Sequence, residues 1–209
     1  MRNGALMSCM SLPLRSRLRH NQLHRAAGPL KLGHAAAFEC WAVPISEYRG
    51  RNDSAHPMPA IITPERPDTT DARALIAELE AQLDPFYPCE SRHGYSVEKL
   101  LAEAVTFFLI RDNGTPAGCG GLKLFGTEYG EVKRMYVRPQ FRGSGLGRLM
   151  LNHLVDCAQS QGIGLLRLET GIHQSAAIGL YERTGFQRIP PFGEYKDDPL
   201  SRFYEKQIR

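Results

Sequence analysis

Arg142-Gly143-Ser144-Gly145-Leu146-Gly147 joins an expected strand that ends at Val137 to an expected helix over 146–161. Glycines at a strand-to-helix junction let backbone N–H groups approach a ligand without interference from a Cβ atom. The start of the helix adds partial positive charge, and Arg142 can add a charge-assisted contact. The stretch therefore predicts a cradle for a diphosphate. A glycine-rich turn that only begins the helix is the alternative interpretation.

Two common phosphate-binding motifs do not fit this stretch. A Walker loop needs Lys followed by Ser or Thr where this chain has Gly147 and Arg148. A dinucleotide-binding motif needs a surrounding βαβ unit, whereas the patterns before the cradle are those of antiparallel strands. The cradle therefore belongs to another class of phosphate-binding protein.

Outward from the cradle, the patterns alternate between strands and helices. The β-branched and aromatic run Val105–Arg111 closes in Asp112-Asn113-Gly114, a hairpin signal before a second strand over 116–125. In chain order we expect a strand over 59–63, helices over 72–83 and from 96, strands over 105–111, 116–125 and 131–137, a helix over 146–161, a strand over 165–170, a helix over 176–184, and short strands around 186 and 203. This order predicts an α/β (α+β) fold, a mixed sheet with helices on both faces.

The first 57 residues carry a net charge of +5 and show no sustained helix or strand period, which leaves a net charge of −1 for the rest of the chain. Three interpretations remain open for 1–57: a disordered extension, a segment translated from a start codon assigned too early, or an organelle transit segment. Met58 directly precedes the first expected strand. We therefore predict one domain over 58–209.

Composition excludes several classes of function. No apolar run is long enough to span a membrane, and the near-neutral domain lacks the basic surface expected for nucleic acid. The cysteines are scattered, without a metal-ligand spacing, so we expect no metal site and free thiols in a reducing, cytoplasmic compartment. Core packing is the expected role of Cys119 and Cys157.

The cradle resembles the acyl-coenzyme A signature of the GNAT (GCN5-related N-acetyltransferase) superfamily, matched by Arg142, Gly145 and Gly147. Two further segments are similar to that superfamily: 131–137 resembles its fourth strand, and Ala176 to Phe186, with Leu-Tyr-Glu-x-x-Gly-Phe, resembles its late helix and turn. The resemblance covers about 150 residues. It implies a mostly antiparallel sheet of about six or seven strands, flanked by about four helices and splayed between the fourth and fifth strands.

The resemblance also implies acetyl-CoA as co-substrate and a set of coenzyme-binding residues. Backbone groups of the fourth strand should bind the pantetheine arm, and the cradle amides should hold the pyrophosphate. The implied coenzyme-binding residues are Met135, Tyr136, Val137, Arg142, Gly143, Ser144, Gly145, Leu146, Gly147, Arg148, Gln174 and Tyr181.

The implied catalytic residues are Tyr181 and Glu131. Tyr181 matches the family position that gives a proton to the departing thiolate, and a tyrosine that only packs its ring is the alternative. Glu131 matches a position used as a general base in some members, although a solvated carboxylate would fit the strand start equally well. Glu169 on the next strand is a rival candidate for the base.

Gln174 stands where many members of the family carry Asn at the start of the late helix. However, 168–171 together with Gln174, and the later segments 189–195 and 198–201, resemble a subgroup of small bacterial, mostly uncharacterised members in which glutamine is ordinary.

The acceptor side should involve aromatic and acidic residues from two loops and the fifth strand: Phe86, Tyr87, Glu169 and Phe192. Loop packing alone would explain the aromatic residues as well. The expected function is transfer of an acetyl group from acetyl-CoA to a primary amine of a small molecule or amino-acid-like acceptor. A protein N-terminal or lysine acetyltransferase and a non-catalytic acyl-CoA-binding regulator are the alternatives, and a homodimer fits the family.

Overall fold

The computed structural model describes residues 60–88 and 91–209. The expectations for residues 1–57 and for a domain start at Met58 lie outside the described residues. The elements follow one another as β1 (Ile61–Pro64), α1 (Thr70–Leu83), α2 (Val97–Ala102), β2 (Thr106–Asp112), β3 (Thr115–Phe125), β4 (Tyr129–Val137), a 3-10 turn (Pro139–Phe141), α3 (Leu146–Ser160), β5 (Leu165–Gly171), α4 (Ser175–Arg183), β6 (Gln187–Ile189) and β7 (Ser201–Gln207). This order confirms the order expected from the sequence.

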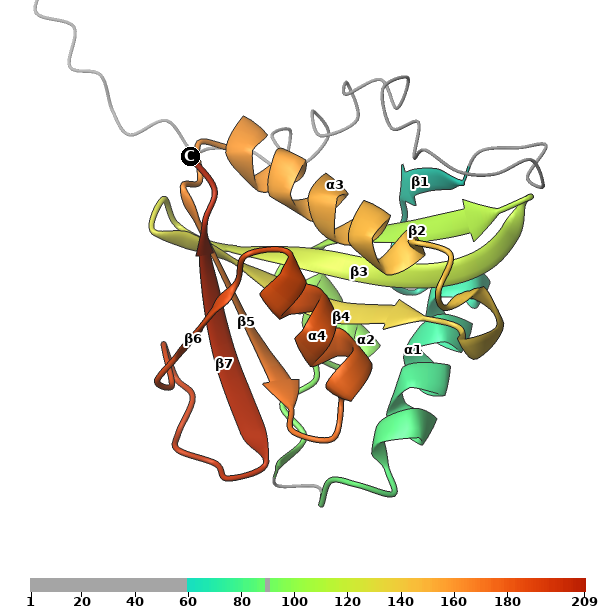
Figure 1. Cartoon of the computed structure of the whole chain (residues 1–209). Helices are drawn as coiled ribbons and strands as arrows, with labels where there is room; N and C mark the ends of the chain where they lie inside the picture. The colour runs from blue at the N-terminus through green and yellow to red at the C-terminus, as the bar shows by residue number, and fades with distance from the viewer. Residues whose placement is uncertain (1–59, 89–90) are drawn as a thin grey trace, which may run out of the picture. The chain divides into compact units, whose positions relative to one another are not determined.

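The strands of the described domain form one seven-stranded sheet in the order β1-β2-β3-β4-β5-β7-β6. β4 and β5 pair in parallel, and the other neighbouring strands are antiparallel. The parallel pair arises because α3 carries the chain from the end of β4 back to the start of β5 (Figure 1). The mixed, mostly antiparallel sheet is therefore confirmed.

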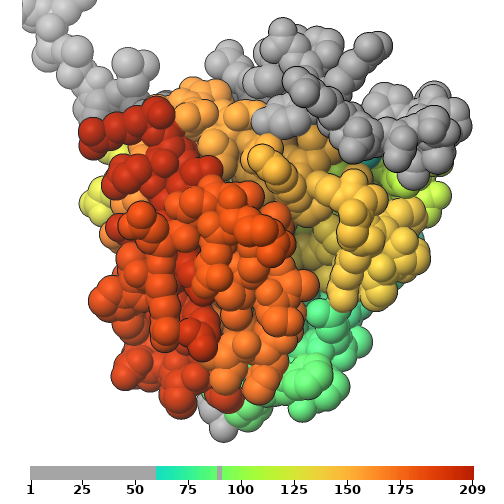
Figure 2. Space-filling view, viewed as in Figure 1, coloured from blue at the N-terminus to red at the C-terminus, as the bar shows by residue number. Residues whose placement is uncertain are grey.

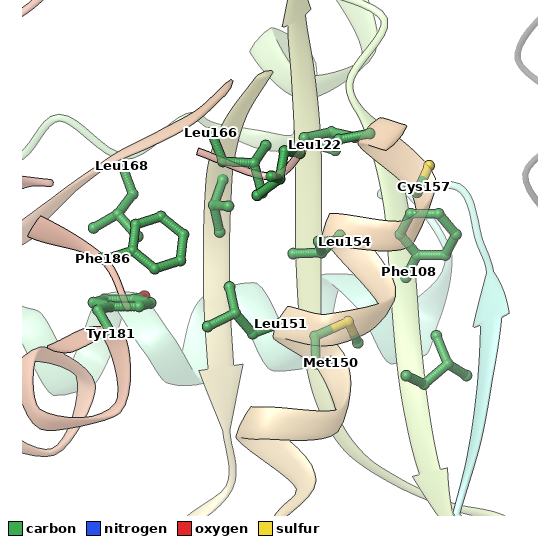
Figure 3. Packing of buried hydrophobic residues seen from close by; sticks show 14 of the residues in the cluster. Phe108, Leu122, Met150, Leu151, Leu154, Cys157, Leu166, Leu168, Tyr181 and Phe186 are labelled. Carbon is green, nitrogen blue, oxygen red and sulfur yellow. The ribbon is translucent and has the colours of Figure 1, made fainter. Parts of the chain in front are cut away.

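The sheet separates two hydrophobic cores, because successive side chains of a strand point to opposite faces. In β2, Phe108 and Ile110 belong to the core under α3 and α4, whereas Phe107 and Leu109 belong to the core under α1 and α2. Figure 3 shows Met150, Leu151 and Leu154 of α3 lying over the strands of the first core. Helices thus cover both faces of the sheet, as expected.

Local sequence explains where the α1-side helices begin. Thr69 accepts a hydrogen bond from the Ala72 amide at the start of α1, and Ser96 accepts one from the Lys99 amide at the start of α2. The expected hairpin turn is confirmed too: Asn113 and Gly114 have φ values of 48° and 76°, the left-handed conformations that a tight hairpin needs.

Cys119 and Cys157 are buried in the two cores, as expected. Burial raises the pKa of the Cys119 thiol to about 12, so this thiol is un-ionised at neutral pH and a poor nucleophile. Within the described residues, no helix is both long and apolar enough to cross a membrane.

Candidate active site

The splay between β4 and β5 creates the space for the site. The two strands pair only from Gly130–Leu166 to Val132–Leu168, although β4 continues to Val137 and β5 to Gly171. Figure 1 shows their arrowheads pointing apart, with α4 in front of the gap. The last part of β4 therefore presents backbone polar groups to an edge without a neighbouring strand, where a ligand can take the place of one.

A β-bulge in β4 determines which side chains reach this edge. The register shifts between Cys119 and Gly121 of β3, and Arg134 opposite them has a φ of 52°. The extra residue shifts the alternation of side chains by one position. Val132 before the bulge and Met135 and Val137 after it therefore all pack on the α3 side.

The cradle leads into α3 through two glycines in the left-handed conformation. Gly143 and Gly145 have φ values of 84° and 88°, and a Cβ atom at either position would meet nothing within 4 Å. No side chain caps the start of α3, so the first-turn N–H groups remain available to an anion. The start of α4 at Gln174 likewise has no side-chain cap.

A cavity of about 560 Å³ lies between the cradle, the end of β4 and the start of α4. In Figure 2 the surface is hollowed between the yellow segment, which contains residues 135–148, and the orange segment, which contains α4. All the expected coenzyme-binding residues except Ser144 line it. The Ser144 hydroxyl instead donates a 2.6 Å hydrogen bond to the Phe141 carbonyl and shapes the loop.

Arg142 lines the cavity and its guanidinium is hydrogen-bonded to protein groups. Its Nε donates a 2.9 Å hydrogen bond to the Val137 carbonyl, and its Nη2 donates to the side-chain oxygen of Gln82. The Gln82 amide in turn donates to Gln174 Oε1 at 3.2 Å. Gln82 of α1 thus links the cradle to the start of α4 along the cavity wall.

A second, smaller cavity of about 120 Å³ adjoins the first. The two cavities share five lining residues: Leu79, Met135, Gln174, Ala177 and Tyr181. The smaller cavity is also lined by Glu80, Arg92, His93, Arg134 and Glu169. The larger cavity is therefore lined by the start of α3 and by basic side chains, the smaller cavity by side chains of both charges, and Tyr181 lines both.

Tyr181 is held by packing. Its side chain is buried among aromatic rings, with the Phe186 ring centroid at 5.8 Å and the Tyr204 centroid at 6.4 Å. Figure 3 shows Tyr181 beside Phe186. Burial, reinforced by the negative charge of Glu169, raises its pKa well above the ordinary tyrosine value. The phenol therefore keeps its proton at neutral pH and is a proton donor rather than a base.

The two carboxylates considered from the sequence lie in different environments. Glu169 lines the smaller cavity and accepts a 2.6 Å hydrogen bond from the Ser201 hydroxyl, and desolvation raises its pKa. Glu131 is 1% exposed and lines neither cavity. It binds Lys133 Nζ at 2.7 Å and the Tyr195 hydroxyl at 2.6 Å.

The structure brings two of the three expected aromatic residues to the site. Phe86 lines the larger cavity and Tyr87 the smaller, where the Tyr87 hydroxyl accepts a 2.8 Å hydrogen bond from the His173 amide. Phe192 lines neither cavity and packs with Tyr129 and Phe203 in a separate cluster.

Sequence reasoning missed several residues that line the two cavities: Leu79, Gln82, Arg92, His93, Arg134 and His173. Arg134 is missed because the bulge, which no local pattern announces, turns it toward the smaller cavity. The sequence does contain one related signal, Gly94, because a Cβ atom at that position would collide with the Arg134 guanidinium.

Comparison with known proteins agrees with this geometry. The sequence model of the Acetyltransferase (GNAT) family matches residues 74–186, more than half of the chain. The chain is 43% identical over 136 residues to an IAA acetyltransferase of Azospirillum brasilense, an alignment that covers 64% of this chain and 88% of that protein. The protein belongs to the GNAT acetyltransferase family.

Solved structures show the same fold. A putative acyl-CoA N-acyltransferase from Klebsiella pneumoniae is 38% identical and superposes with a TM-score of 0.62 over 72% of this chain and 98% of that one. The PaiA N-acetyltransferase of Thermoplasma acidophilum, solved in complex with coenzyme A, superposes with a TM-score of 0.57 at 22% identity over 72% and 99% of the two chains. The protein is thus an acyltransferase of the N-acetyltransferase class, with acetyl-CoA as its co-substrate.

Proposed function

We propose that this protein transfers the acetyl group of acetyl-CoA directly to a primary amine of a small molecule. The coenzyme occupies the larger cavity, with its pyrophosphate on the uncapped start of α3 and its pantetheine arm along the free edge of β4. The acceptor occupies the smaller cavity. The observation that carries this proposal is that the two cavities meet at Tyr181.

The proposed reaction uses two side chains at this junction. Glu169 takes a proton from the acceptor ammonium, and the free amine attacks the thioester carbonyl. The new C–N bond forms, the C–S bond breaks, and its electron pair leaves on sulfur. Tyr181 protonates this thiolate and is reprotonated by the proton that the acylated nitrogen releases. Glu131 has a structural role in this scheme, because Lys133 and Tyr195 occupy its carboxylate.

The size of the acceptor cavity supports a small acceptor. About 120 Å³ is below the roughly 300–1,000 Å³ typical of drug-sized ligand sites. A protein N-terminus or lysine remains the competing acceptor class, and a binding protein without turnover is the competing non-enzymatic class.

Calorimetric titration of the full chain with acetyl-CoA and coenzyme A, and with ADP as control, tests the coenzyme site. A thiol-release assay then tests acceptors: small amines, amino acids, short peptides with free N-termini, and IAA, for which the Azospirillum relative is named. Saturable acetyl-CoA binding with turnover on small amines supports the proposal. Turnover on peptides alone would favour the protein-acceptor alternative, and tight binding without any turnover would favour the regulator.

A further inference from the structure

Arg92 has an unsatisfied hydrogen-bond donor beside the smaller cavity. Its Nη1 contacts the Asp84 carboxylate, which is the only ion-pair partner of this guanidinium among the described residues. Its Nε is buried and has no hydrogen-bond partner among the described residues, and the residue lines the cavity wall. A buried donor without an acceptor is unfavourable, so an additional acceptor at this guanidinium would be favourable.

The other arginine of the cavity is already engaged. Arg134 donates from Nε to the Tyr95 carbonyl at 2.6 Å and pairs with Glu80 through Nη1. Arg134 also holds the backbone at Tyr95, three residues after Arg92. His93 Nε2 lies 3.4 Å from the Asp198 carboxylate but, like Arg92 Nε, has no hydrogen-bond partner among the described residues. Of the two arginines, Arg92 is therefore the one with donor capacity to spare.

An arginine whose Nη1 is occupied can still bind a carboxylate through Nη2, and a small turn of the side chain would add Nε, so that two parallel N–H donors match the two carboxylate oxygens. Glu169 supplies the opposite charge in the same cavity. Because Arg134 and Glu80 pair with each other, Arg92 and Glu169 are the cavity's arginine and carboxylate outside that pair, an arrangement complementary to a small zwitterion.

We propose that the acceptor carries a carboxylate next to its amine, as an α-amino acid does, and that Arg92 binds this carboxylate while Glu169 faces the ammonium. This inference rests on the proposed function, since it takes the smaller cavity as the acceptor site. Arg92 thereby determines specificity for acceptors that carry a carboxylate next to the amine.

Matched acceptor pairs test the proposal on the full-length protein. Each of a panel of small α-amino acids is compared with its amide, which keeps the amine and the shape but removes the charge. The amide has the lower amine pKa, so more of its amine is un-ionised at neutral pH, and a preference for the acid therefore reports recognition of the carboxylate. We expect kcat/KM to favour the acids at least about tenfold, and Arg92→Gln to remove this preference through the KM of the acids. Arg92→Lys should restore part of it.

Arg66→Gln is the matched control, because Arg66 is exposed and contacts only Asp68 among the described residues. This variant should keep the wild-type preference. Thermal melting of each variant shows that it is folded before its kinetics are compared.

A binding measurement separates this proposal from the proposed function. N-acetyl amino acids and N-acetyl amino acid amides are titrated calorimetrically into the coenzyme A complex of wild type and Arg92→Gln. Arg92-dependent preference for the acids supports the carboxylate site even if no acceptor is turned over, in which case the proposed acetyl transfer to such acceptors fails instead. Equal turnover or equal binding of acids and amides would overturn the role of Arg92 and leave the proposed function standing.

Discussion

The Tyr195 hydroxyl donates a 2.6 Å hydrogen bond to Glu131 Oε1. Lys133 Nζ binds the same oxygen at 2.7 Å, and the Tyr195 hydroxyl also lies 2.7 Å from Lys133 Nζ. This bond fastens the loop between β6 and β7 to β4. Glu131 and Lys133 are both almost fully buried, so the hydroxyl satisfies charged groups that water does not reach.

Tyr195→Phe should therefore lower the free energy of unfolding by about 1–3 kcal/mol, because it leaves buried charged groups short of a partner. Denaturant unfolding measures the change. Tyr129→Phe is the matched control, since no hydrogen bond of its hydroxyl is found within the described residues and it should cost less. Equal losses in the two variants would show that the bond to Glu131 contributes nothing specific.

Tyr181→Phe should lower kcat by roughly 10²-fold or more, because the thiolate would leave without its proton donor. Acetyl-CoA affinity should change little, since the ring and its packing against Phe186 remain. Thiol release at saturating substrates measures kcat, and calorimetry measures the dissociation constant. Wild-type turnover in this variant would remove Tyr181 from the mechanism.

The pH profile should identify Glu169 as the base. Desolvation raises its pKa above the ordinary carboxyl value, and the active form is the deprotonated one. Activity should therefore be complete above this raised pKa and be lost as the pH falls through it. Glu169→Gln should lower kcat/KM and flatten this acid limb of the profile.

Glu131→Gln is the control for Glu169. It should lower stability, because Lys133 loses its paired charge, but keep the acid limb, moved slightly to lower pH because the Glu131 charge contributes to the raised pKa of Glu169. An acid limb that vanishes in Glu131→Gln and persists in Glu169→Gln would reverse the two assignments.

Gly145→Glu should weaken acetyl-CoA binding by more than about tenfold, at least about 1.4 kcal/mol, because it places a carboxylate where the pyrophosphate is expected. The substituted residue would also have to adopt the left-handed backbone conformation of Gly145, with a φ of 88°, which lowers stability by itself. Gly126→Glu controls for that cost: Gly126 has a φ of 57° and open space around its Cβ position, and it lies in the β3–β4 turn. The control should keep wild-type affinity, measured by calorimetry.

Much of the fold could be predicted from the sequence because its signals are local. The alternation of Phe107 and Phe108 between two cores, the Asn113-Gly114 turn and the glycines of 143–147 each depend on a few neighbouring residues. The same holds for the proposed coenzyme side of the site, since the cradle and the end of β4 are nearly contiguous in the chain and belong to one junction.

The acceptor side could not be predicted in the same way, because it depends on non-local geometry. Glu131 and Glu169 are both acidic residues on strands, so local sequence does not distinguish them. The pairing of β4 with β5 and the position of the 190–200 loop place Glu131 in a charged cluster and Glu169 at the cavity. Arg134 reaches the cavity through a bulge, and Arg92 reaches it from a segment that precedes β2, well before β4 and β5 in the chain. The sequence by itself determined the element order and the glycine-rich cradle. The tertiary structure decided which ionisable side chains line the cavity beside Tyr181, because strand register, the bulge and loop placement are set by packing between distant parts of the chain.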